Sequence, residues 1–370
     1  MCGFTFTVFL SAFQLLPTAP FEILARGGST FDSGLFLGFL TYSSAFSAPV
    51  TGGFSDRAGQ RRVLITASIA LTIFSIAYAI VPGFRILLLI VLIHGVFWSG
   101  LLSASAAYLT NSIPESRRAE GVAYWGLSSV AAIALAPPIG FWVYRFGWTT
   151  LCVESAGLNL VMAAIAWRLP DQPVPARVVH RRGVEWRVLA LSITLFLYSF
   201  GYGGITSFTA LYADANGVSH KGIYLTALSV VILVTRPLAG RLADRLGPRR
   251  VLMPCLALIA VGLACLCAGG TLRWLLTSAI VFGTGFGTAY PVFVAHVMNH
   301  VGPERRGAAF GAILAAFDTG IGTGSTLMGW IIGSHGFVAA FGTAAALSAL
   351  SLPYFIATDG LLGATTARRS

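Results

Sequence analysis

Two charged segments of this sequence, GGFSDRAGQRR at residues 52–62 and GRLADRLGPRR at residues 240–250, are near copies of one another. They lie 188 residues apart, and each follows a long apolar run. A motif repeated in this way predicts that the chain consists of two similar halves. The matched positions are Gly52 and Gly240, Asp56 and Asp244, Arg57 and Arg245, Gly59 and Gly247, Arg61 and Arg249, and Arg62 and Arg250.

The composition indicates an integral membrane protein. Of the 370 residues, 56% are hydrophobic and only 10% are charged, whereas soluble domains carry about 25% charged residues. The apolar runs have the length of membrane helices, about 20 residues, while the strands of a membrane barrel are about 10 residues long. The five cysteines lie in apolar runs without metal-ligand spacing, so neither a metal site nor a disulfide framework is predicted.

The apolar runs predict an all-α integral membrane protein with twelve transmembrane helices in two pseudo-symmetric six-helix bundles. Residues 1–168 are expected to form the N-terminal bundle, residues 169–187 a cytoplasmic linker, and residues 188–370 the C-terminal bundle. The first run has no basic residue, and we therefore expect a membrane helix there rather than a secretory signal. The predicted spans are residues 3–25, 32–54, 63–82, 85–110, 119–144, 148–168, 187–212, 221–240, 250–269, 273–297, 306–333 and 337–358.

The positive charges predict the orientation of the helices. Of the 24 lysines and arginines, nineteen follow even-numbered spans, end the eighth span or lie in the C-terminal tail. By the positive-inside rule both termini are expected in the cytoplasm. This distribution accounts for the net charge of +11, and no nucleic-acid partner is expected. The five charges on the opposite side are Arg26, Arg85, Arg145, Lys221 and Arg273.

The repeat also predicts a motion. Two halves with the same helix order are expected to enclose a cavity that opens to either side as one half rocks against the other. An aspartate at a helix end can bind arginines or the N-terminus of a neighbouring helix. We therefore expect the doubled motif to form a cytoplasmic clamp that closes in one state and breaks in the other. Alternatively, its arginines only fix the orientation of the helices.

The doubled G-x-x-x-D-R-x-G-x-R-R resembles the signature between helices 2 and 3 of the major facilitator superfamily. LLPTAP at 15–20 is similar to the proline motif of its twelve-helix exporters, and FGTGFGTAYPVF at 282–293 and AAFDTGIGTG at 315–324 resemble bacterial sugar-efflux and multidrug-efflux members. ALAPPIGFWVY at 134–144 looks like their antiporter motif, with Pro137, Pro138 and Gly140 present and Ala136 in place of a glycine. The resemblance implies proton-driven export of a small amphiphilic, drug-like or sugar-like molecule across the bacterial cytoplasmic membrane.

Helix 4 departs from the pattern of these exporters, which carry an arginine three residues before a Gln-Gly pair. Here Val91 stands at the arginine position and His94 at the glutamine position, before Gly95. Because that arginine influences proton transfer in the family, its absence leaves the coupling open. Two alternatives therefore stay open: a nutrient uniporter or proton symporter of the same fold, and a non-transporting membrane receptor or assembly partner.

Polar residues within the spans are candidates for the proton or substrate site. Asp318 is expected about twelve residues into its span, roughly 18 Å from the cytoplasmic end, where a charge costs about 2.5–3.5 kcal/mol. We interpret it as a protonatable carboxylate; the alternative is a neutral carboxyl that only supports packing. His94 is either a proton carrier or a packing residue, Glu154 is expected to pair with Arg145, and Arg236 either reaches the cytoplasm or faces an anionic group. The candidates are Asp318, His94, Glu22, Arg236, Glu154, Gln14 and Tyr290.

Motifs for enzyme chemistry are missing from the sequence. Lys221 is the sole lysine and no phosphate-cradling G-x-x-x-x-G-K-[ST] exists, nor does an H-E-x-x-H or G-x-S-x-G segment. We expect a transporter rather than an enzyme, without a cofactor, whose partners are a small-molecule substrate, protons and the lipid bilayer. Because two halves of one chain can close a pathway, a monomer is expected.

Overall fold

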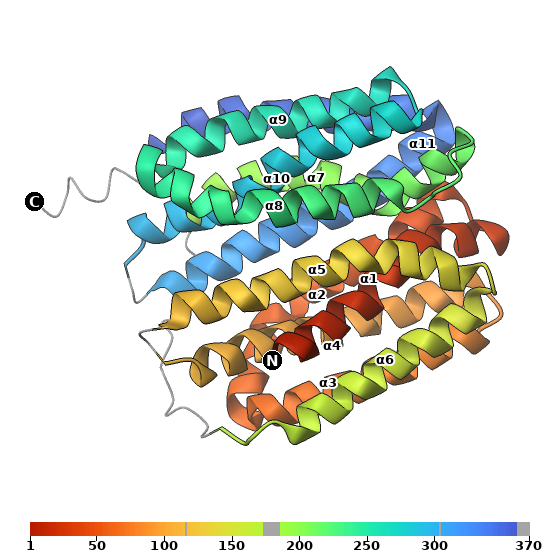
Figure 1. Ribbon diagram of the computed structural model, residues 1–370, viewed down its shortest axis with the longest axis horizontal. Helices are drawn as coiled ribbons and strands as arrows, with labels where there is room; N and C mark the ends of the chain where they lie inside the picture. The colour runs from red at the N-terminus through yellow and green to blue at the C-terminus, as the bar shows by residue number, and fades with distance from the viewer. Residues whose placement is uncertain (115–116, 173–185, 303–304, 361–370) are drawn as a thin grey trace, which may run out of the picture.

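The computed structural model describes residues 1–114, 117–172, 186–302 and 305–360 (Figure 1), and all structural statements below refer to these residues. They form eleven helices and no strand, which confirms the predicted all-α architecture. Most of the predicted linker, residues 173–185, lies outside the described part. The helices are α1 (Cys2–Ala25), α2 (Thr30–Ala58), α3 (Gln60–Ile80), α4 (Phe84–Ser112), α5 (Arg118–Tyr144), α6 (Trp148–Arg168), α7 (Trp186–Ala215), α8 (Ile223–Leu246), α9 (Pro248–Ala268), α10 (Leu272–His300) and α11 (Arg306–Thr358).

The last helix combines two predicted spans. Its 53 residues rise about 80 Å at 1.5 Å per residue, far more than the roughly 30 Å of membrane hydrocarbon. Gly336 interrupts it with φ 82° and ψ 174°, so that two helices are joined across a kink, and the ribbon of α11 reverses direction along its length (Figure 1). This residue lies between the spans predicted at 306–333 and 337–358.

Ten of the described helices are long and apolar enough to cross a membrane. The helix α11 counts once among them, and α2, which contains Pro49, Asp56 and Arg57, does not qualify. The number of twelve spans therefore stays a prediction, although the helix boundaries follow the predicted runs closely.

Each copy of the doubled motif ends one helix and starts the next. Asp56, Arg57, Asp244 and Arg245 lie in the final helical turns of α2 and α8. The chain turns at Gly59 (φ 89°) and Gly247 (φ 86°), a left-handed conformation that strains any other residue. Both turns lie at the same end of the molecule, at the left of Figure 1, as a parallel repeat requires. We call this the motif end and the other the opposite end.

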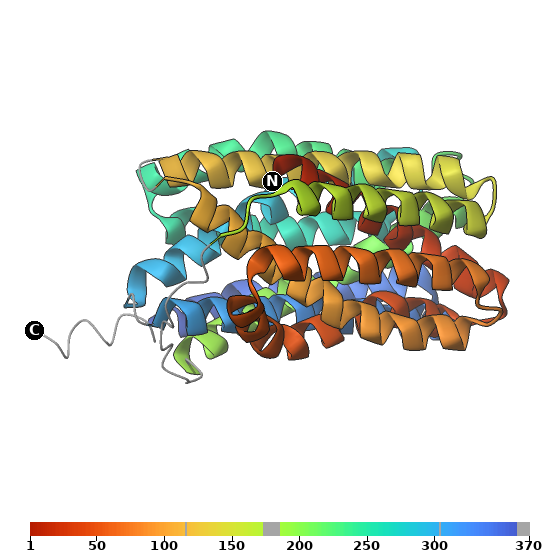
Figure 2. The ribbon, with the colours of Figure 1, turned by 90° about the horizontal axis from the view of Figure 1, so that it is seen from below.

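The helices pack as two groups that run side by side (Figure 1 and Figure 2). Helices α1–α6 pack against one another and form the N-terminal half, while α7–α11 form the C-terminal half. The C-terminal half has one continuous core that includes Tyr198, Phe208 and Phe282. The core of the N-terminal half is divided between a cluster around Tyr78 and another around Phe4.

The two halves meet mainly where α2 packs against α11. Their hydrogen bonds are Thr30 Oγ1 to the Gly329 carbonyl (2.7 Å), Ser325 Oγ to the Gly34 carbonyl (2.8 Å) and Tyr42 Oη with Thr323 Oγ1 (2.8 Å). These three hydrogen bonds lie toward the opposite end, in the first half of α2 and the middle of α11.

The motif end is open in comparison. A Cβ atom at Gly52, Gly53 or Gly240 would meet no atom within 4 Å, and Asp56 and Asp244 are exposed. The contacts between the halves gather toward the opposite end, and we interpret the structure as a state that is closed there and open at the motif end.

Gly34→Val is expected to shift the protein toward the state that is open at the opposite end. A Cβ at Gly34 would collide with the carbonyl oxygen of Ser325, and overpacking of this kind costs about 1–3 kcal/mol, which changes a population ratio roughly 5- to 150-fold. Spin labels at Pro82 and Ser219, in a cysteine-free background, are expected to report a larger population of long distances. Gly157→Val is the control, because a Cβ at Gly157 meets no atom within 4 Å. Identical distance distributions for both variants would contradict the closing role of this contact.

Candidate functional site

Three of the predicted site residues come together in the C-terminal half: Asp318 on α11, Tyr290 on α10 and Arg236 on α8. The ring of Tyr290 lies 4.8 Å from that of Phe317, the neighbour of Asp318. The helices α8 and α10 approach closely, since a Cβ at Gly287, one turn before Tyr290, would lie 3.0 Å from Thr235 Oγ1. Tyr290 is within electrostatic range of both Asp318 and Arg236. We call these three residues the polar trio.

Both charged members of the trio lack a partner. Asp318 is half-buried and Arg236 exposed, and neither forms a hydrogen bond or ion pair with any residue that the structure describes. A carboxyl group inside an apolar helix without a protein partner is costly when ionised. Asp318 is therefore available to a proton or to a donor group of a substrate, and Arg236 to an acceptor or anionic group.

An aromatic cluster adjoins the trio. Phe317 lies 6.1 Å from Phe286, whose ring stacks on Tyr202 at 4.4 Å and meets Tyr198 edge-on at 5.9 Å. Tyr202, Tyr290 and Phe317 are half-buried. Such rings offer flat apolar surfaces with offset or edge-to-face partners, which suits the apolar part of an amphiphilic molecule.

The polar trio has no counterpart in the N-terminal half. At the 188-residue offset of the doubled motif, Ala48, Leu102 and Val130 stand where the C-terminal half has Arg236, Tyr290 and Asp318. The repeated scaffold therefore does not require these polar groups, which favours a functional role for them.

His94 lies elsewhere, within the N-terminal half. Its Nδ1 is 2.8 Å from the hydroxyl of Tyr78, its ring stacks on Phe74 at 5.6 Å, and it is 7% exposed. It lines a small cavity with Ser11, Ser75 and Asn159 that has room for about one water molecule. Val91, at the position of the usual arginine, is fully buried in the apolar core.

Glu154 binds Gln14 instead of Arg145. Gln14 Nε2 donates to Glu154 Oε1 at 3.2 Å, while the guanidinium of Arg145 lies over the rings of Trp142 and Phe146, at 5.0 and 4.7 Å from their centroids. The predicted pair of Glu154 with Arg145 is therefore wrong. The side chain of Gln14 reaches Glu154 because α1 packs against α6, a contact that spacing along the sequence does not reveal.

Glu22 is held by two partners near the opposite end. Arg26 Nε donates to Glu22 Oε1 at 2.6 Å, and the hydroxyl of Tyr144 donates to Glu22 Oε2 at 3.2 Å. These contacts join α1 to α5 and occupy the carboxylate, which separates Glu22 from the polar trio.

The arginines of the doubled motif bind acids that the sequence analysis did not single out. Arg61 donates to Asp171 Oδ2 at 2.9 Å and to the Trp167 carbonyl, and Arg249 binds Asp359 at 3.1 Å. Asp171 and Asp359 are themselves 188 residues apart, so an examination of the tail of each half at this offset could have found them. We call these two contacts the twin ion pairs.

The aspartates of the motif are free in this state. Asp56 and Asp244 are exposed and form no ion pair with another described residue. The expected clamp of motif aspartates with arginines is thus not formed in a state that is open at the motif end. Arg57, Arg62, Arg245 and Arg250 are exposed as well.

The antiporter-type motif lies at contacts between helices. Pro137 and Pro138 are inside α5, and a Cβ at Gly140 would lie 3.0 Å from the Cα of Gln14 on α1. A Cβ at Gly222, before α8, would lie 3.3 Å from Pro137. The motif therefore positions α5 against both its own half and the other half.

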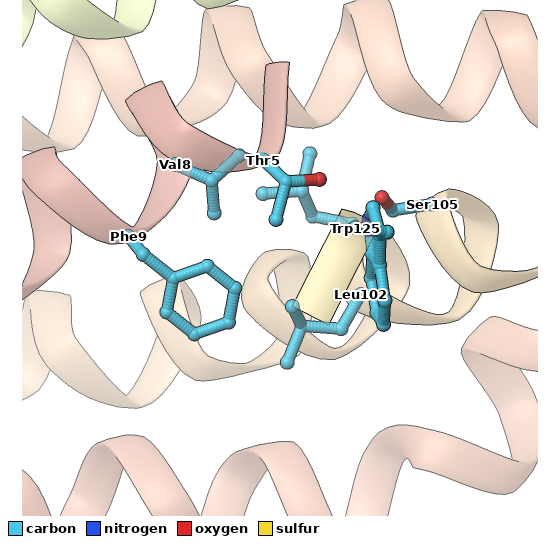
Figure 3. Close-up of a pocket in the computed structure, with 7 residues that line it drawn as sticks. Thr5, Val8, Phe9, Leu102, Ser105 and Trp125 are labelled. Atoms are coloured by element: carbon cyan, nitrogen blue, oxygen red, sulfur yellow. The ribbon is translucent and has the colours of Figure 1, made fainter. Parts of the chain in front are cut away.

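Figure 3 shows another recess, between α1, α4 and α5. Thr5, Val8 and Phe9 face Leu102, Ser105 and Trp125 across it (Figure 3). The recess has no room for a water molecule in this conformation, so we do not place the substrate there. The described residues also contain no group of three or more metal-binding side chains.

Proteins of similar sequence and structure are membrane transporters. The sequence model of the Major Facilitator Superfamily matches residues 1–227 and 191–369. An uncharacterised MFS-type transporter from Burkholderia pseudomallei (strain 1106a) is 25% identical over 368 residues, which cover 94% of this chain and 88% of that protein. A crystallised variant of the nucleoside transporter NupG has a TM-score of 0.81 at 16% identity, covering 96% of this chain and 98% of that chain. A bacterial homologue of the human lysosomal transporter Spinster, in an inward-facing and occupied conformation, has a TM-score of 0.71 at 15% identity, covering 99% and 95%.

The twin ion pairs are expected to differ in their contribution to stability. The side chain of Asp359 is 12% exposed and also binds His296 at 2.6 Å, whereas that of Asp171 is 74% exposed. Hydrogen bonds to charged groups contribute about 1.5–3 kcal/mol when sheltered, but exposed ion pairs only about 0–1 kcal/mol. Asp359→Asn is therefore expected to lower the unfolding temperature in detergent, and Asp171→Asn to leave it nearly unchanged. An equal decrease of the unfolding temperature in the two variants would show that the burial of the aspartate does not determine the contribution of the ion pair.

Proposed function

This chain belongs to the major facilitator superfamily, and from that premise we propose that it exports a small amphiphilic, drug-like or sugar-like molecule in exchange for protons. It is a membrane transporter for small molecules and not an enzyme. The proposal rests on Asp318, a half-buried carboxyl group without a hydrogen-bond or ion-pair partner in the described part of the chain. Asp318 follows Phe317, which belongs to the aromatic cluster and whose ring contacts that of Tyr290.

Asp318 exchanges protons in the proposed cycle. In the state open to the cytoplasm, a neutral or weakly cationic substrate places its apolar part on the aromatic cluster and displaces the proton of Asp318. In the state open to the outside, where protons are more abundant, Asp318 takes up a proton and the substrate leaves. An ionised carboxylate within the membrane costs about 2.5–3.5 kcal/mol, so each half of the cycle needs either a proton or a substrate at this site. Arg236, which like Asp318 lies within electrostatic range of Tyr290, is available in this cycle to an acceptor group of the substrate.

The motif end faces the cytoplasm in this proposal, in the cytoplasmic membrane of a bacterium. The basic residues of the sequence gather in the segments on that side, and by the positive-inside rule we expect both termini there as well. The bundles of residues 1–168 and 188–370 rock as units in a monomer. Asp56 and Asp244, free in the open state, are available to bind the other half when the motif end closes, which is the clamp expected from the doubled motif.

A uniporter without proton coupling is the second candidate. The observation that favours it is Val91, which is buried in the apolar core at the position where related exporters carry an arginine. A uniporter would equilibrate its substrate in either direction and would not respond to a proton gradient.

Asp318→Asn is expected to abolish proton-driven transport while preserving exchange. The amide keeps the shape of the side chain but cannot ionise, so substrate–substrate counterflow continues, while accumulation driven by a pH gradient falls roughly 5- to 150-fold, the usual range of coupling between two sites. The substrate for this assay comes from a transport screen in an efflux-deficient strain at two external pH values. Counterflow and pH-driven uptake are then measured in proteoliposomes.

Asp214→Asn provides the matched control for this substitution. Asp214 binds Lys221 at 2.8 Å near the opposite end, so its loss is expected to leave the coupling intact. Full proton-driven transport by Asp318→Asn would remove the proposed role of Asp318. A wild-type protein that ignores the pH gradient would instead support the uniporter.

A further inference from the structure

We propose that the N-terminal half contains a second proton-binding site, in which His94 takes up a proton that enters at Glu154 along a hydrated seam between α1 and α6. This inference concerns residues that the proposed cycle at Asp318 does not use. The seam consists of Ser11 and Gln14 on α1, Glu154, Ser155 and Asn159 on α6, and His94 on α4.

Polar contacts run along the seam from one end to the other. Gln14 Nε2 donates to Glu154 Oε1 at 3.2 Å. One turn away on α1, Ser11 Oγ is 3.4 Å from the carbonyl oxygen of Ser155. Further along α6, Asn159 Nδ2 donates to Ser75 Oγ of α3 at 3.1 Å. Polar side chains therefore cross the interior of the N-terminal bundle along this seam.

Unpaired polar atoms gather in this seam. Gln14 Oε1, Glu154 Oε2, Ser155 Oγ, Asn159 Oδ1 and His94 Nε2 are all buried without a hydrogen-bond partner. A buried polar group without a partner costs about 1–3 kcal/mol, and proteins usually satisfy such groups with ordered water. Five such atoms along one helix contact indicate a path for water rather than a dry core.

The inner end of the seam is the cavity at His94. It is lined by His94, Asn159, Ser75 and Ser11 and has room for about one water molecule. His94 and Asn159 are 7% and 3% exposed, so a molecule held between them is shielded from both faces of the bundle. Water is the ligand that fits this volume and these groups.

Burial disfavours the charged form of the His94 ring, and two hydrogen-bond acceptors and an aromatic face around it offset part of this cost. A protonated imidazole donates two hydrogen bonds. The Tyr78 oxygen can accept one from Nδ1 at 2.8 Å, and a water molecule in the cavity that His94 shares with Asn159 can accept the other from Nε2. The ring of Phe74 stacks on the imidazole at 5.6 Å, and an aromatic face attracts a cation.

The titratable groups around His94 are few. The Tyr78 hydroxyl of α3 contacts His94 directly, and Glu154 lies further along α6, outside the His94 cavity. On α2, which packs against α4, Asp32 binds Ser29 and Tyr42 binds Thr323; α1 contributes the neutral Ser11 to the cavity. No arginine or lysine of the described part pairs with Glu154. The proton that leaves the Glu154 carboxyl passes through water to the Nε2 lone pair of His94, so the charge moves from one titratable group to the other.

Nuclear magnetic resonance of the protein in liposomes tests this inference without a substrate. The chain, with its six histidines, is labelled with ¹⁵N-histidine, and His94→Gln identifies the His94 signal. In the wild type the signal is expected to change from the neutral to the charged form as the pH is lowered from about 8 to about 3, because burial shifts the titration of a histidine below its ordinary range. Asn159→Leu removes the amide acceptor and fills the cavity, and is expected to keep His94 neutral over that range.

Two further variants separate this site from the proposed transport cycle. Glu154→Gln is expected to slow proton exchange at His94, and Asp318→Asn to leave the titration of His94 unchanged. Far-ultraviolet circular dichroism and the unfolding temperature verify that each variant is folded. A neutral His94 throughout the range in the wild type, or the same titration in Asn159→Leu, would overturn the second site. If Asp318→Asn loses proton-driven transport but His94 still titrates as in the wild type, the second site at His94 is supported.

Discussion

The contact between α2 and α11 at the opposite end is the interaction on which the state of this molecule depends. The two helices approach so closely there that neither Gly34 nor Gly38 of α2 has space for a Cβ. A Cβ at Gly34 would collide with the carbonyl oxygen of Ser325, and one at Gly38 with Oγ1 of Thr326. Between membrane helices close packing has to supply attraction that the hydrophobic effect cannot provide in lipid. Three hydrogen bonds from Thr30, Tyr42 and Ser325 then set the register of the two helices. The open motif end follows from this closure.

The scaffold of the molecule is duplicated, but its reactive groups are not. The turns at Gly59 and Gly247 and the twin ion pairs recur at the 188-residue offset, because each half must end and orient its helices in the same way. Asp318 belongs only to the C-terminal half, and His94 only to the N-terminal half. Groups that repeat therefore serve the fold and its motion, whereas groups that occur once are where chemistry is expected.

The sequence predicted the members of the candidate site better than their contacts. Asp318 was identifiable because a carboxyl group in an apolar run is costly, and Tyr290 and Arg236 because both are polar residues within predicted spans. That these three meet was not predictable, since the contact depends on how α8, α10 and α11 pack. Glu154 was identified for the same reason as Asp318, but its partner proved to be Gln14. The pair of Glu154 with Arg145 was inferred from their closeness in the sequence. This inference was wrong because α1, 140 residues away in the chain, places Gln14 next to Glu154.

The sequence by itself determined the helices, their ends and their duplication. These properties are local: the thickness of the hydrocarbon sets the length of each run, the backbone in lipid has to be helical to satisfy its hydrogen bonds, and glycine at a positive φ breaks the chain at Gly59, Gly247 and Gly336. Only the tertiary structure decided which end is closed, which acid each motif arginine binds, and which polar groups remain without partners. Those outcomes depend on hydrogen-bond geometry between helices far apart in the chain, where a shift of about 1 Å makes or removes a contact.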